Sequence, residues 1–418
     1  MKSLVDRRLV SELAEAFRTE NCLLLTGPRQ VGKTTLARLL CENLRRSHLY
    51  LDLEQREDLE LIEDFSNFVN RYRDHLVVLD EAQIAEFLFP LLRRQLDDQI
   101  ETNEHTKWLL LGSATKRLRE FVSENLGGRF RSFELAPFEL SEIPALETAS
   151  PYTSTANFTV DEVGTAPVEN PGTLEALNEL WLRGGYPRSY LAEDPVSSLG
   201  WRREYLQSVF NSPSDTSRPD LVPSVWEILC GDPGGISNFD SFGSVLGCKR
   251  AVIDEIVRQL VISNLVRELR SWHSQPARSY GRPSKYYIRD SGLLHANWGF
   301  ADIAAVRSSD ISGASWEGFV IEMLLLNAPY SASPFYYRNQ DGDEIDLVLQ
   351  LSREKKLAIE IKLSDTKAVS SGFYRACEQI GPSERFVVHG GEQTVRNASD
   401  STVDALCLQD AINLVRRI

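Results

Sequence analysis

Residues 27–34 read Gly27-Pro28-Arg29-Gln30-Val31-Gly32-Lys33-Thr34, and Thr35 follows them. This is the pattern G-x-x-x-x-G-K-S/T, in which backbone N–H groups and a helix N-terminus surround phosphate oxygens. The apolar run CLLLT precedes the pattern and the helix-like run TTLARLL follows it, which is the strand-loop-helix context that the mechanism requires. Residues 27–35 are therefore predicted to bind the phosphates of ATP. Lys33 should reach the β- and γ-phosphates, and the Thr34 hydroxyl should ligate Mg²⁺.

The surrounding sequence predicts an α/β fold. Between Cys22 and Phe138, short apolar runs such as LYLDLE, LVVLDE and KWLLLGS alternate with helix-like segments. Unbroken apolar runs of this kind are typical of strands that are buried on both faces of a parallel sheet. We expect the parallel sheet of a P-loop nucleoside triphosphatase, with helices on both faces.

A second strand supplies acids for the same site. The run Leu76-Val77-Val78-Leu79 ends in Asp80 and Glu81. Downstream of a complete phosphate loop, this arrangement is expected to place Asp80 beside the Mg²⁺, through a water molecule, and to let Glu81 polarise the attacking water. Glu81 therefore favours hydrolysis over nucleotide binding alone.

Three further residues are candidates with open alternatives. Ser113 follows the apolar run 108–111, where its hydroxyl either senses the γ-phosphate or caps the next helix. Arg29 and Arg129 either neutralise charge in the transition state or are only solvated or ion-paired.

Length and composition limit the remaining possibilities. The 418 residues contain 46 Lys+Arg and 60 Asp+Glu, a net charge of −14, with 42% apolar residues. These values indicate two or three globular domains and exclude a wholly basic nucleic-acid coat, although not a local basic face. The six cysteines form no C-x-x-C pair, so neither a disulfide framework nor a zinc site is expected. The N-terminus resembles an amphipathic helix rather than a signal peptide, and no run is long enough to span a membrane, so we expect a cytoplasmic protein.

Changes of pattern along the chain predict the domain boundaries. Residues 1–141 form the nucleotide-binding core, and residues 142–172, which are rich in Ser, Thr, Pro, Gly and Ala, form a loop or linker. Residues 173–295 form a helical region with a helix-turn-helix and a hairpin, as in a winged helix. The pattern of residues 296–418 predicts a helix, three strands, a second helix and a further strand, in that order.

The middle region contains a candidate DNA face. Between residues 267 and 289 six cations stand against one acid, with aromatic residues among them. Such a segment gives sequence-tolerant phosphate contacts, or it is only the solvated hairpin of a winged helix that serves for packing. The residues predicted to contact DNA are Lys249, Arg250, Arg267, Arg270, Arg278, Arg282 and Lys285.

The C-terminal region contains carboxylates at a spacing typical of Mg²⁺-dependent nucleases. Asp346 and the run Glu360-Ile361-Lys362 fall on adjacent predicted strands, so a hairpin brings them together. The acids would hold the metal and the lysine would position the water. Glu322 on the preceding helix is a further candidate ligand, and Gln379 a weak addition. The alternative is a surface hairpin with ordinary salt bridges, and a nuclease fold would not establish nuclease activity.

The stretches GPRQVGKTT, LVVLDEAQ, LLLGSAT, LGGRFRSFELAPFELSE and LRGGYPRSYL together resemble the prokaryotic AAA-type ATPases of uncharacterised function. The stretches KYYIRDSGLL, WEGFVIEMLL, EIDLVL and IEIKLS are similar to the C-terminal, restriction-endonuclease-like domain of unknown function in those proteins. The resemblance implies an AAA-type core, a winged helix and a PD-(D/E)xK fold. Its nucleotide-site residues fall on Gly27, Gly32, Lys33, Thr34, Asp80 and Glu81, and its nuclease-like residues on Glu322, Asp346, Glu360 and Lys362.

Three functions are consistent with these patterns. The first is Mg²⁺-dependent ATP hydrolysis coupled to DNA binding and DNA cleavage by the C-terminal part. The second is a nucleotide-switched regulatory protein whose nuclease-like part is a binding scaffold, with an unidentified protein partner. The third, a simple transcription factor, does not need Glu81 and is the least favoured. An oligomer that supplies an arginine to a neighbouring site is compatible with the first two.

Overall fold

The computed structural model describes residues 5–44, 46–102, 106–113, 116–143, 172–212, 216–236, 238–275, 282–364, 369–396 and 403–418. The chain divides into two compact units, Met1–Pro137 with Ile262–Asn264, and Phe138–Val261 with Leu265–Ile418. Most of the predicted 142–172 loop, and the candidate DNA contact Arg278, lie outside the described residues. The division of the chain into three domains stays a prediction.

The first unit is a parallel sheet with helices on both faces, as predicted. Its strands follow the order β2-β3-β4-β1-β5, and every neighbouring pair is parallel. Because both faces are covered, the two central strands β1 and β4 are apolar nearly throughout. The strands are β1 (Cys22–Gly27), β2 (His48–Asp52), β3 (Leu76–Asp80), β4 (Lys107–Ser113) and β5 (Arg131–Glu134).

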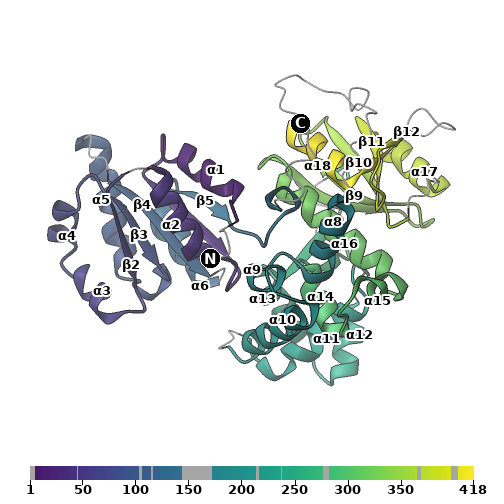
Figure 1. Ribbon diagram of the computed structural model, residues 1–418, viewed down its shortest axis with the longest axis horizontal. Helices are drawn as coiled ribbons and strands as arrows, with labels where there is room; N and C mark the ends of the chain where they lie inside the picture. Colours follow the sequence, from purple (N-terminus) through teal and green to yellow (C-terminus); the bar gives the residue numbers. More distant parts are fainter. Residues whose placement is uncertain are drawn as a thin grey trace. The chain divides into compact units, whose positions relative to one another are not determined.

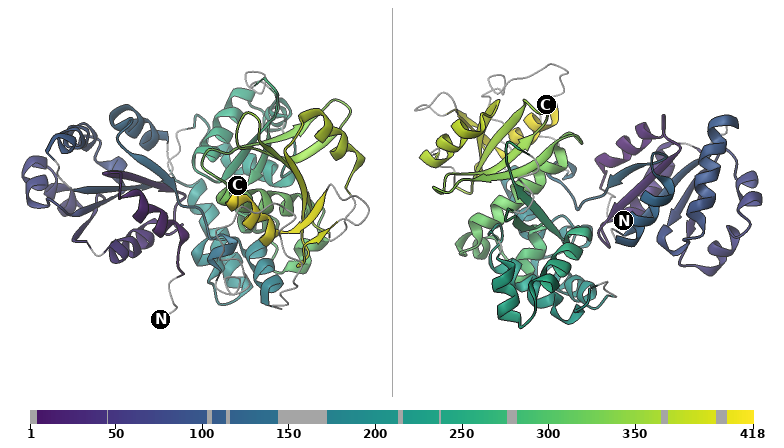
Figure 2. Two further views of the ribbon diagram at one scale, coloured as in Figure 1. Left: turned by 90° about the horizontal axis from the view of Figure 1, so that it is seen from above. Right: turned by 180° about the vertical axis from the view of Figure 1, so that it is seen from behind.

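Two helix layers bury the faces of this sheet. Helices α4, α5 and α6 pack on the face that carries Cys22, Val77 and Trp108. In the left view of Figure 2, the purple N-terminal helices lie on the opposite side of the sheet from the blue ones. The helices are α1 (Arg8–Ala16), α2 (Lys33–Leu44), α3 (Arg56–Leu61), α4 (Phe65–Arg71), α5 (Leu88–Thr102) and α6 (Lys116–Leu126).

The second unit begins with helices, among which α12 and α13 are joined by a short turn at the predicted helix-turn-helix. Helix α12 ends at Gly247, whose φ of 64° is the left-handed conformation that glycine adopts readily. The helices before the hairpin of strands β6 (Val266–Ser271) and β7 (Lys285–Ile288) are α8 (Gly172–Arg183), α9 (Pro187–Tyr190), α10 (Pro195–Phe210), α11 (Val222–Gly231), α12 (Phe239–Leu246) and α13 (Arg250–Ile262). Helices α14 (Ser291–Trp298) and α15 (Ile303–Ser308) follow the hairpin and complete this part, as Figure 1 shows.

The hairpin of the candidate winged helix belongs to a sheet that also holds the C-terminal strands. The sheet has eight strands in the order β12-β13-β11-β10-β9-β8-β6-β7, and β6 runs parallel to β8 at Arg270–Phe335 and Ser271–Tyr336. The predicted boundary at residue 295 thus falls between strands of one sheet. The strands are β6 (Val266–Ser271), β7 (Lys285–Ile288), β8 (Ser333–Arg338), β9 (Glu344–Gln350), β10 (Lys356–Lys362), β11 (Glu384–His389), β12 (Val395–Arg396) and β13 (Asp404–Cys407).

Three helices accompany the C-terminal strands: α16 (Ser312–Asn327), α17 (Ser371–Ile380) and α18 (Leu408–Arg417). Helix α17 packs Phe373 and Cys377 against Val348 of β9 and Ala358 of β10. In Figure 1, α17 lies on the opposite side of the strands from α18, which contacts α16. Helix α16 is apolar almost all round, as expected for a helix that is surrounded by protein.

Candidate functional site

The predicted phosphate loop connects β1 to α2. Two of its residues have left-handed backbone conformations, Gln30 with a φ of 59° and Gly32 with a φ of 102°. Such alternation turns successive N–H groups toward one point and creates a concave anion site. Gly27 is required at the start of the loop, since a Cβ there would lie 2.4 Å from the carbonyl oxygen of Leu135. Val31 is completely buried and anchors the loop to the unit.

Lys33 points into this loop. Its ammonium donates to the carbonyl oxygens of Gly27, at 3.1 Å, and Pro28, at 3.0 Å. The residue is only 8% exposed. Burial lowers the pKa of Lys33, although the charges of Glu81 and Asp80 oppose that shift. The lysine is therefore positioned inside the loop by weak carbonyl partners that a phosphate oxygen can replace.

The residues that would ligate Mg²⁺ are in contact with each other. The Thr34 hydroxyl donates to Oδ2 of Asp80 at 2.8 Å. Tyr50 of β2 also donates its hydroxyl hydrogen to Oδ2 of Asp80. A hydroxyl and a carboxylate at the N-terminus of α2 are donors that Mg²⁺ prefers, so the residues present fit the ion. The sequence did not identify Tyr50, because only the parallel register of β2 with β3 brings it to Asp80.

Glu81 follows Asp80 in a strained backbone conformation, with a φ of 52°. Its backbone N–H donates to Oδ1 of Asp80 at 3.0 Å, and its carboxylate accepts a hydrogen bond from the side-chain amide of Gln83. Ser113 is paired in register with Gly27, so it lies beside the strand that leads into the phosphate loop. These placements agree with the predicted roles of Glu81 and Ser113, which stay predictions.

The two candidate arginines differ in their surroundings. Arg29 is exposed within the phosphate loop. Arg129 forms a two-pronged ion pair with Asp97 of α5, at 2.6 and 3.1 Å. Its guanidinium is thus already paired within the first unit, and a role in the transition state would require this pair to open.

In the second unit, a cluster of charged side chains surrounds Lys285 of β7. The Lys285 ammonium lies 2.7 Å from Oε1 of Glu344 and 3.1 Å from Oε1 of Glu317 on α16. The residue is 5% exposed. Burial alone would lower the pKa of Lys285, but Glu317, Asp346 and Glu344 together raise it. Lys285 is therefore an ammonium ion inside the protein.

The predicted nuclease-like residues border this cluster. Burial, with the charges of Glu317 and Glu360, raises the pKa of Asp346, whose Oδ2 accepts the backbone N–H of Ile361 at 2.8 Å. Glu360 is paired with Lys362 at 2.6 Å. The structure therefore brings Asp346, Glu360 and Lys362 into one region, as the sequence predicts.

Glu322 was expected to join this cluster, and the structure corrects that expectation. Its carboxylate accepts from Arg267, at 2.6 and 2.9 Å, and from Arg289, at 3.0 Å. Burial alone would raise the pKa of Glu322, but the two guanidinium charges lower it to about 2. The helix acid that faces Asp346 and Glu360 is Glu317. The two glutamates are five residues apart, about 140° around a helix, and therefore lie on different faces.

The carboxylates around Lys285 already surround a cation, the Lys285 ammonium. Within the described ranges, no group of three or more His, Cys, Asp or Glu side chains has the arrangement of a metal site. The Lys285 ammonium occupies the space between Glu317 and Glu344. The residues present do not fit a metal ion in this arrangement.

The predicted DNA contacts are dispersed. Arg267 and Lys285 are held in the buried ion pairs described above, so their charges are not available to phosphate. Arg250 is exposed but pairs with Asp240 at 2.9 Å and with Asp254 at 3.4 Å. The remaining described residues of this set, Lys249, Arg270 and Arg282, are exposed.

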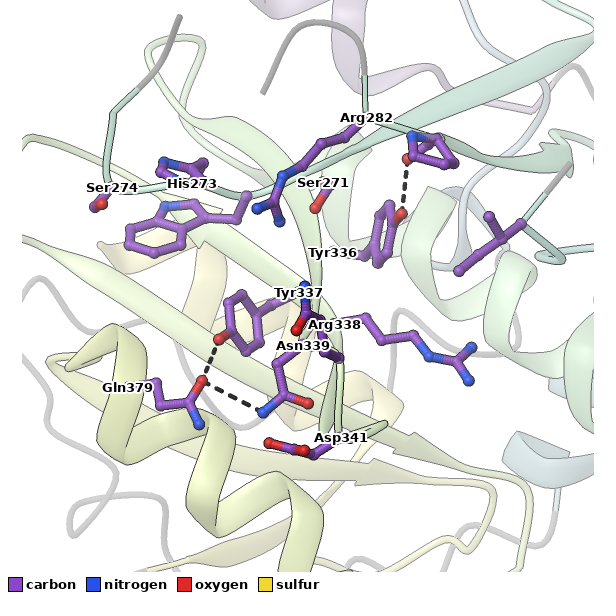
Figure 3. Close-up of a pocket in the computed structure, with 14 residues that line it drawn as sticks. Ser271, His273, Ser274, Arg282, Tyr336, Tyr337, Arg338, Asn339, Asp341 and Gln379 are labelled. Atoms are coloured by element: carbon purple, nitrogen blue, oxygen red, sulfur yellow. Dashed lines mark hydrogen bonds between the residues drawn. The ribbon is translucent and has the colours of Figure 1, made fainter. Parts of the chain in front are cut away.

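A pocket of about 820 Å³ lies where β6, β8 and the segment that precedes β7 meet the C-terminal end of α17 (Figure 3). Trp272, Tyr336 and Tyr337 contribute aromatic rings, and Arg282 contributes a guanidinium. The pocket also contains Gln379, whose carbonyl oxygen accepts from the hydroxyl of Tyr337 and from the amide of Asn339. Gln379, a weak candidate for the nuclease-like site, is therefore a lining residue of this pocket.

Comparisons with known proteins support the nucleotide site. Residues 19–144 match the family model described as an AAA domain. Residues 174–303 and 312–409 match two domains of unknown function, DUF8612 and DUF4143. No helix in the described part of the chain is long and apolar enough to cross a membrane.

Whole-chain relatives and solved structures were also found. The uncharacterized protein Rv2008c of Mycobacterium tuberculosis and the uncharacterized protein Mb2031c of Mycobacterium bovis are each 30% identical over 400 residues, covering 93% of this chain and 81% of theirs. The Walker-type ATPase of Pyrococcus abyssi is 16% identical with a TM-score of 0.43, covering 71% of this chain and 96% of its own. The Orc1 protein of Aeropyrum pernix in complex with DNA is 17% identical with a TM-score of 0.31, covering 73% of this chain and 95% of its own.

Proposed function

Because this chain belongs to the family of these uncharacterised mycobacterial proteins and carries an AAA domain, we propose that its first unit hydrolyses ATP with the help of Mg²⁺. The observation that carries the proposal is the 2.8 Å hydrogen bond between Thr34 and Asp80, beside a lysine held inside the phosphate loop. An ordinary turn has no reason to bury a lysine at this point.

Each residue of the site has a role in this proposal. Lys33 leaves its two carbonyl partners and binds the β- and γ-phosphate oxygens. Thr34 and Asp80 would hold Mg²⁺. Bound Mg²⁺ supplies charge neutralisation on the phosphates. Glu81 accepts a hydrogen bond from the attacking water, which requires that its bond with Gln83 opens.

The test of this proposal is ATP turnover with variants of the loop lysine. Lys33→Ala is expected to lower turnover at least a hundredfold, because both nucleotide binding and charge stabilisation depend on the ammonium. Lys355→Ala, an exposed lysine of the second unit, is the matched control and should leave turnover unchanged. Normal turnover in Lys33→Ala would refute the assignment of the site.

We further propose that the second unit binds nucleic acid and that ATP controls this binding. The pocket beside β6 and β8 supports this proposal, because the half-buried rings of Trp272 and Tyr337 and the exposed guanidinium of Arg282 line it. Aromatic rings stack on unpaired bases and arginine contributes both charge and stacking, at about 1–3 kcal/mol per stacked base. Lys249, Arg250 and Arg270 are the other exposed cations among the described residues of the predicted DNA contacts.

Fluorescence anisotropy with labelled single-stranded and double-stranded DNA tests the second proposal. Arg282→Ala and Trp272→Ala are expected to weaken binding of the single strand at least fivefold. Trp298→Ala is the matched control, since this indole is 45% exposed on α14 and does not line the pocket. Wild-type protein that binds neither DNA, with or without ATP, would refute the proposal.

Cleavage of the bound DNA is not part of the proposed function. Of the candidate functions, the arrangement around Lys285 favours the nucleotide-switched protein with a binding scaffold over the nuclease. In that function, the nuclease-like part binds nucleic acid or a protein partner, with an affinity that depends on the nucleotide bound to the first unit.

A further inference from the structure

We propose that the ammonium of Lys285 is the resident cation of the carboxylate cluster in the second unit, and that it takes the place of the divalent metal that such a cluster would otherwise bind. The inference goes beyond the proposed function, because it depends on neither ATP hydrolysis nor nucleic-acid binding. It explains why residues in a nuclease-like order need not form a nuclease site.

The contacts of Lys285 are those of a structural counter-ion. Its ammonium is shared between Glu344 and Glu317, at 2.7 and 3.1 Å, and the lysine side chain is 6% exposed. Tyr287, two residues along β7, donates its hydroxyl hydrogen to the same oxygen of Glu317. Two residues of one strand therefore act together on the carboxylate of α16.

The backbone and a neighbouring ring fix the position of Lys285. It is paired with Leu269 on β6 and forms an isolated bridge with Ile236 on the other side. Its ammonium lies 5.5 Å from the centre of the Tyr336 ring, within the range of a cation–π contact. A lysine held in this way cannot easily turn into solvent, unlike an ordinary surface lysine.

The charges of the cluster are already largely balanced. Its four carboxylates are Glu317, Glu344, Asp346 and Glu360. Three cations face them, since Lys362 pairs with Glu360 and Arg338 lies 3.7 Å from Glu344, in addition to Lys285. A divalent ion placed among these acids would meet three positive charges at short range, and repulsion in a partly buried site is strong.

Lys285 should therefore control metal affinity. Removing the ammonium leaves Glu317, Glu344 and Asp346 short of a counter-ion, and hard carboxylate oxygens then favour a divalent ion such as Mn²⁺ or Mg²⁺. A positively charged side chain at position 285, in contrast, should keep the divalent ion out of the cluster.

Mn²⁺ binding, followed by electron paramagnetic resonance of the free ion, tests the proposal. All variants carry Asp80→Asn, which removes the metal ligand of the first unit. With Lys285 intact, we expect no saturable Mn²⁺ site up to millimolar concentration. Lys285→Met should gain one saturable site, with a dissociation constant at least tenfold below the highest Mn²⁺ concentration at which the protein with Lys285 intact shows none, and the added Asp346→Asn should remove it. Lys355→Met, which changes an exposed lysine, is the control and should gain no site.

Two results would overturn the proposal. One is a saturable Mn²⁺ site in the protein with Lys285 intact that is lost in Asp346→Asn. The other is a folded Lys285→Met protein without any gain of Mn²⁺. If Lys285→Met does not fold, Lys285→Gln replaces it. The search for a Mn²⁺ site in the protein with Lys285 intact does not depend on either variant. None of these measurements depends on ATP turnover or on DNA.

Discussion

Tyr50 donates its hydroxyl hydrogen to Asp80, the same carboxylate that accepts the hydrogen bond of Thr34. Neighbouring parallel strands β2 and β3 bring the two residues together. Both hydroxyls donate to Oδ2, so Tyr50 helps to orient the carboxylate oxygen that Thr34 of the phosphate loop contacts. Orientation of a metal-binding acid by a second residue commonly affects metal affinity by about 10–100-fold.

Removing this tyrosine hydroxyl should weaken Mg²⁺ binding more than it affects the chemistry. We expect Tyr50→Phe to raise the Mg²⁺ concentration needed for half-maximal ATP turnover by about tenfold, with a smaller change in maximal turnover. The measurement is a Mg²⁺ titration of turnover at saturating ATP. Tyr330→Phe, at a residue that is 96% exposed, is the matched control. An unchanged Mg²⁺ dependence in Tyr50→Phe would show that Tyr50 does not orient Asp80.

The hydroxyl of Thr34, rather than the shape of its side chain, should carry the metal contact. Thr34→Val keeps the volume and removes the oxygen, so we expect turnover to fall at least a hundredfold. Thr34→Ser keeps the oxygen and should retain turnover within about tenfold of wild type. Equal losses in the two variants, measured at saturating Mg²⁺, would contradict a direct role of the hydroxyl.

Glu322 should determine stability instead of metal binding. Glu322→Gln leaves Arg267 and Arg289 without their buried counter-charge, and breaking such a pair costs about 3–5 kcal/mol. Asp240→Asn breaks the exposed pair with Arg250, for which we expect a cost of about 1 kcal/mol or less. Urea unfolding of the two variants measures the difference, and similar small losses in both would contradict the buried ion-pair assignment.

The ion pairs of Glu322 with Arg267 and Arg289 should also make the stability of the fold depend on pH in the acid range. The pKa of Glu322 is lowered to about 2 in the folded protein, below its ordinary value of 4.5. A lowered carboxyl pKa contributes stability above pH 4.5, and this contribution is lost as the pH falls toward 2. The stability of Glu322→Gln should therefore vary less with pH than that of wild type between pH 4.5 and 2, as thermal unfolding would show.

His295 should make the second unit sensitive to mild acid. It is completely buried, and its ring nitrogens contact the carbonyl oxygen of Leu182, at 3.1 Å, and the Ser315 hydroxyl, at 2.7 Å. The Ser315 oxygen also accepts the indole N–H of Trp181, so a neutral ring that accepts from Ser315 satisfies all three groups. Burial lowers the pKa of His295 from 6.5 to about 3.

The sign of this effect follows from the lowered pKa. The unfolded chain takes up a proton near pH 6.5 and the folded one only near pH 3, so stability is lost as the pH falls through this interval, by about 1.4 kcal/mol for each pH unit. We expect the unfolding temperature of wild type to fall more steeply between pH 6.5 and 5 than that of His295→Gln. Parallel pH profiles of the two proteins would contradict this expectation.

The parts of the molecule that could be predicted from sequence are those that short stretches encode. The phosphate loop, its flanking strand and helix, and the Asp80–Glu81 strand end depend on local order, and the parallel sheet that contains them follows from unbroken apolar runs. Asp346 and Glu360 could be brought together because a hairpin joins their strands.

Residues that meet through distant strands could not be predicted. The sequence predicts Lys285 to be a DNA contact on the hairpin of a winged helix, because nothing in its local sequence shows that β6 joins β8 in one sheet. Glu317 was missed and Glu322 chosen, although both are single acids on one apolar helix, since only the packing of α16 shows which face meets β9 and β10. Three cations of the basic segment, Arg267, Lys285 and Arg289, therefore form ion pairs with buried or half-buried acids.

ATP hydrolysis at the first unit is the central proposed activity of this protein, and substitution of Glu81 tests it most directly. The measurement is single-turnover ATP hydrolysis by wild type and Glu81→Gln at a protein concentration where binding of a fluorescent ATP analogue is saturated in both. We predict that Glu81→Gln binds the analogue as wild type does and hydrolyses ATP at least a hundredfold more slowly, since only the water-polarising carboxylate is lost. Equal rates of hydrolysis in the two proteins, or a wild type that binds the analogue and does not hydrolyse ATP, would contradict the account.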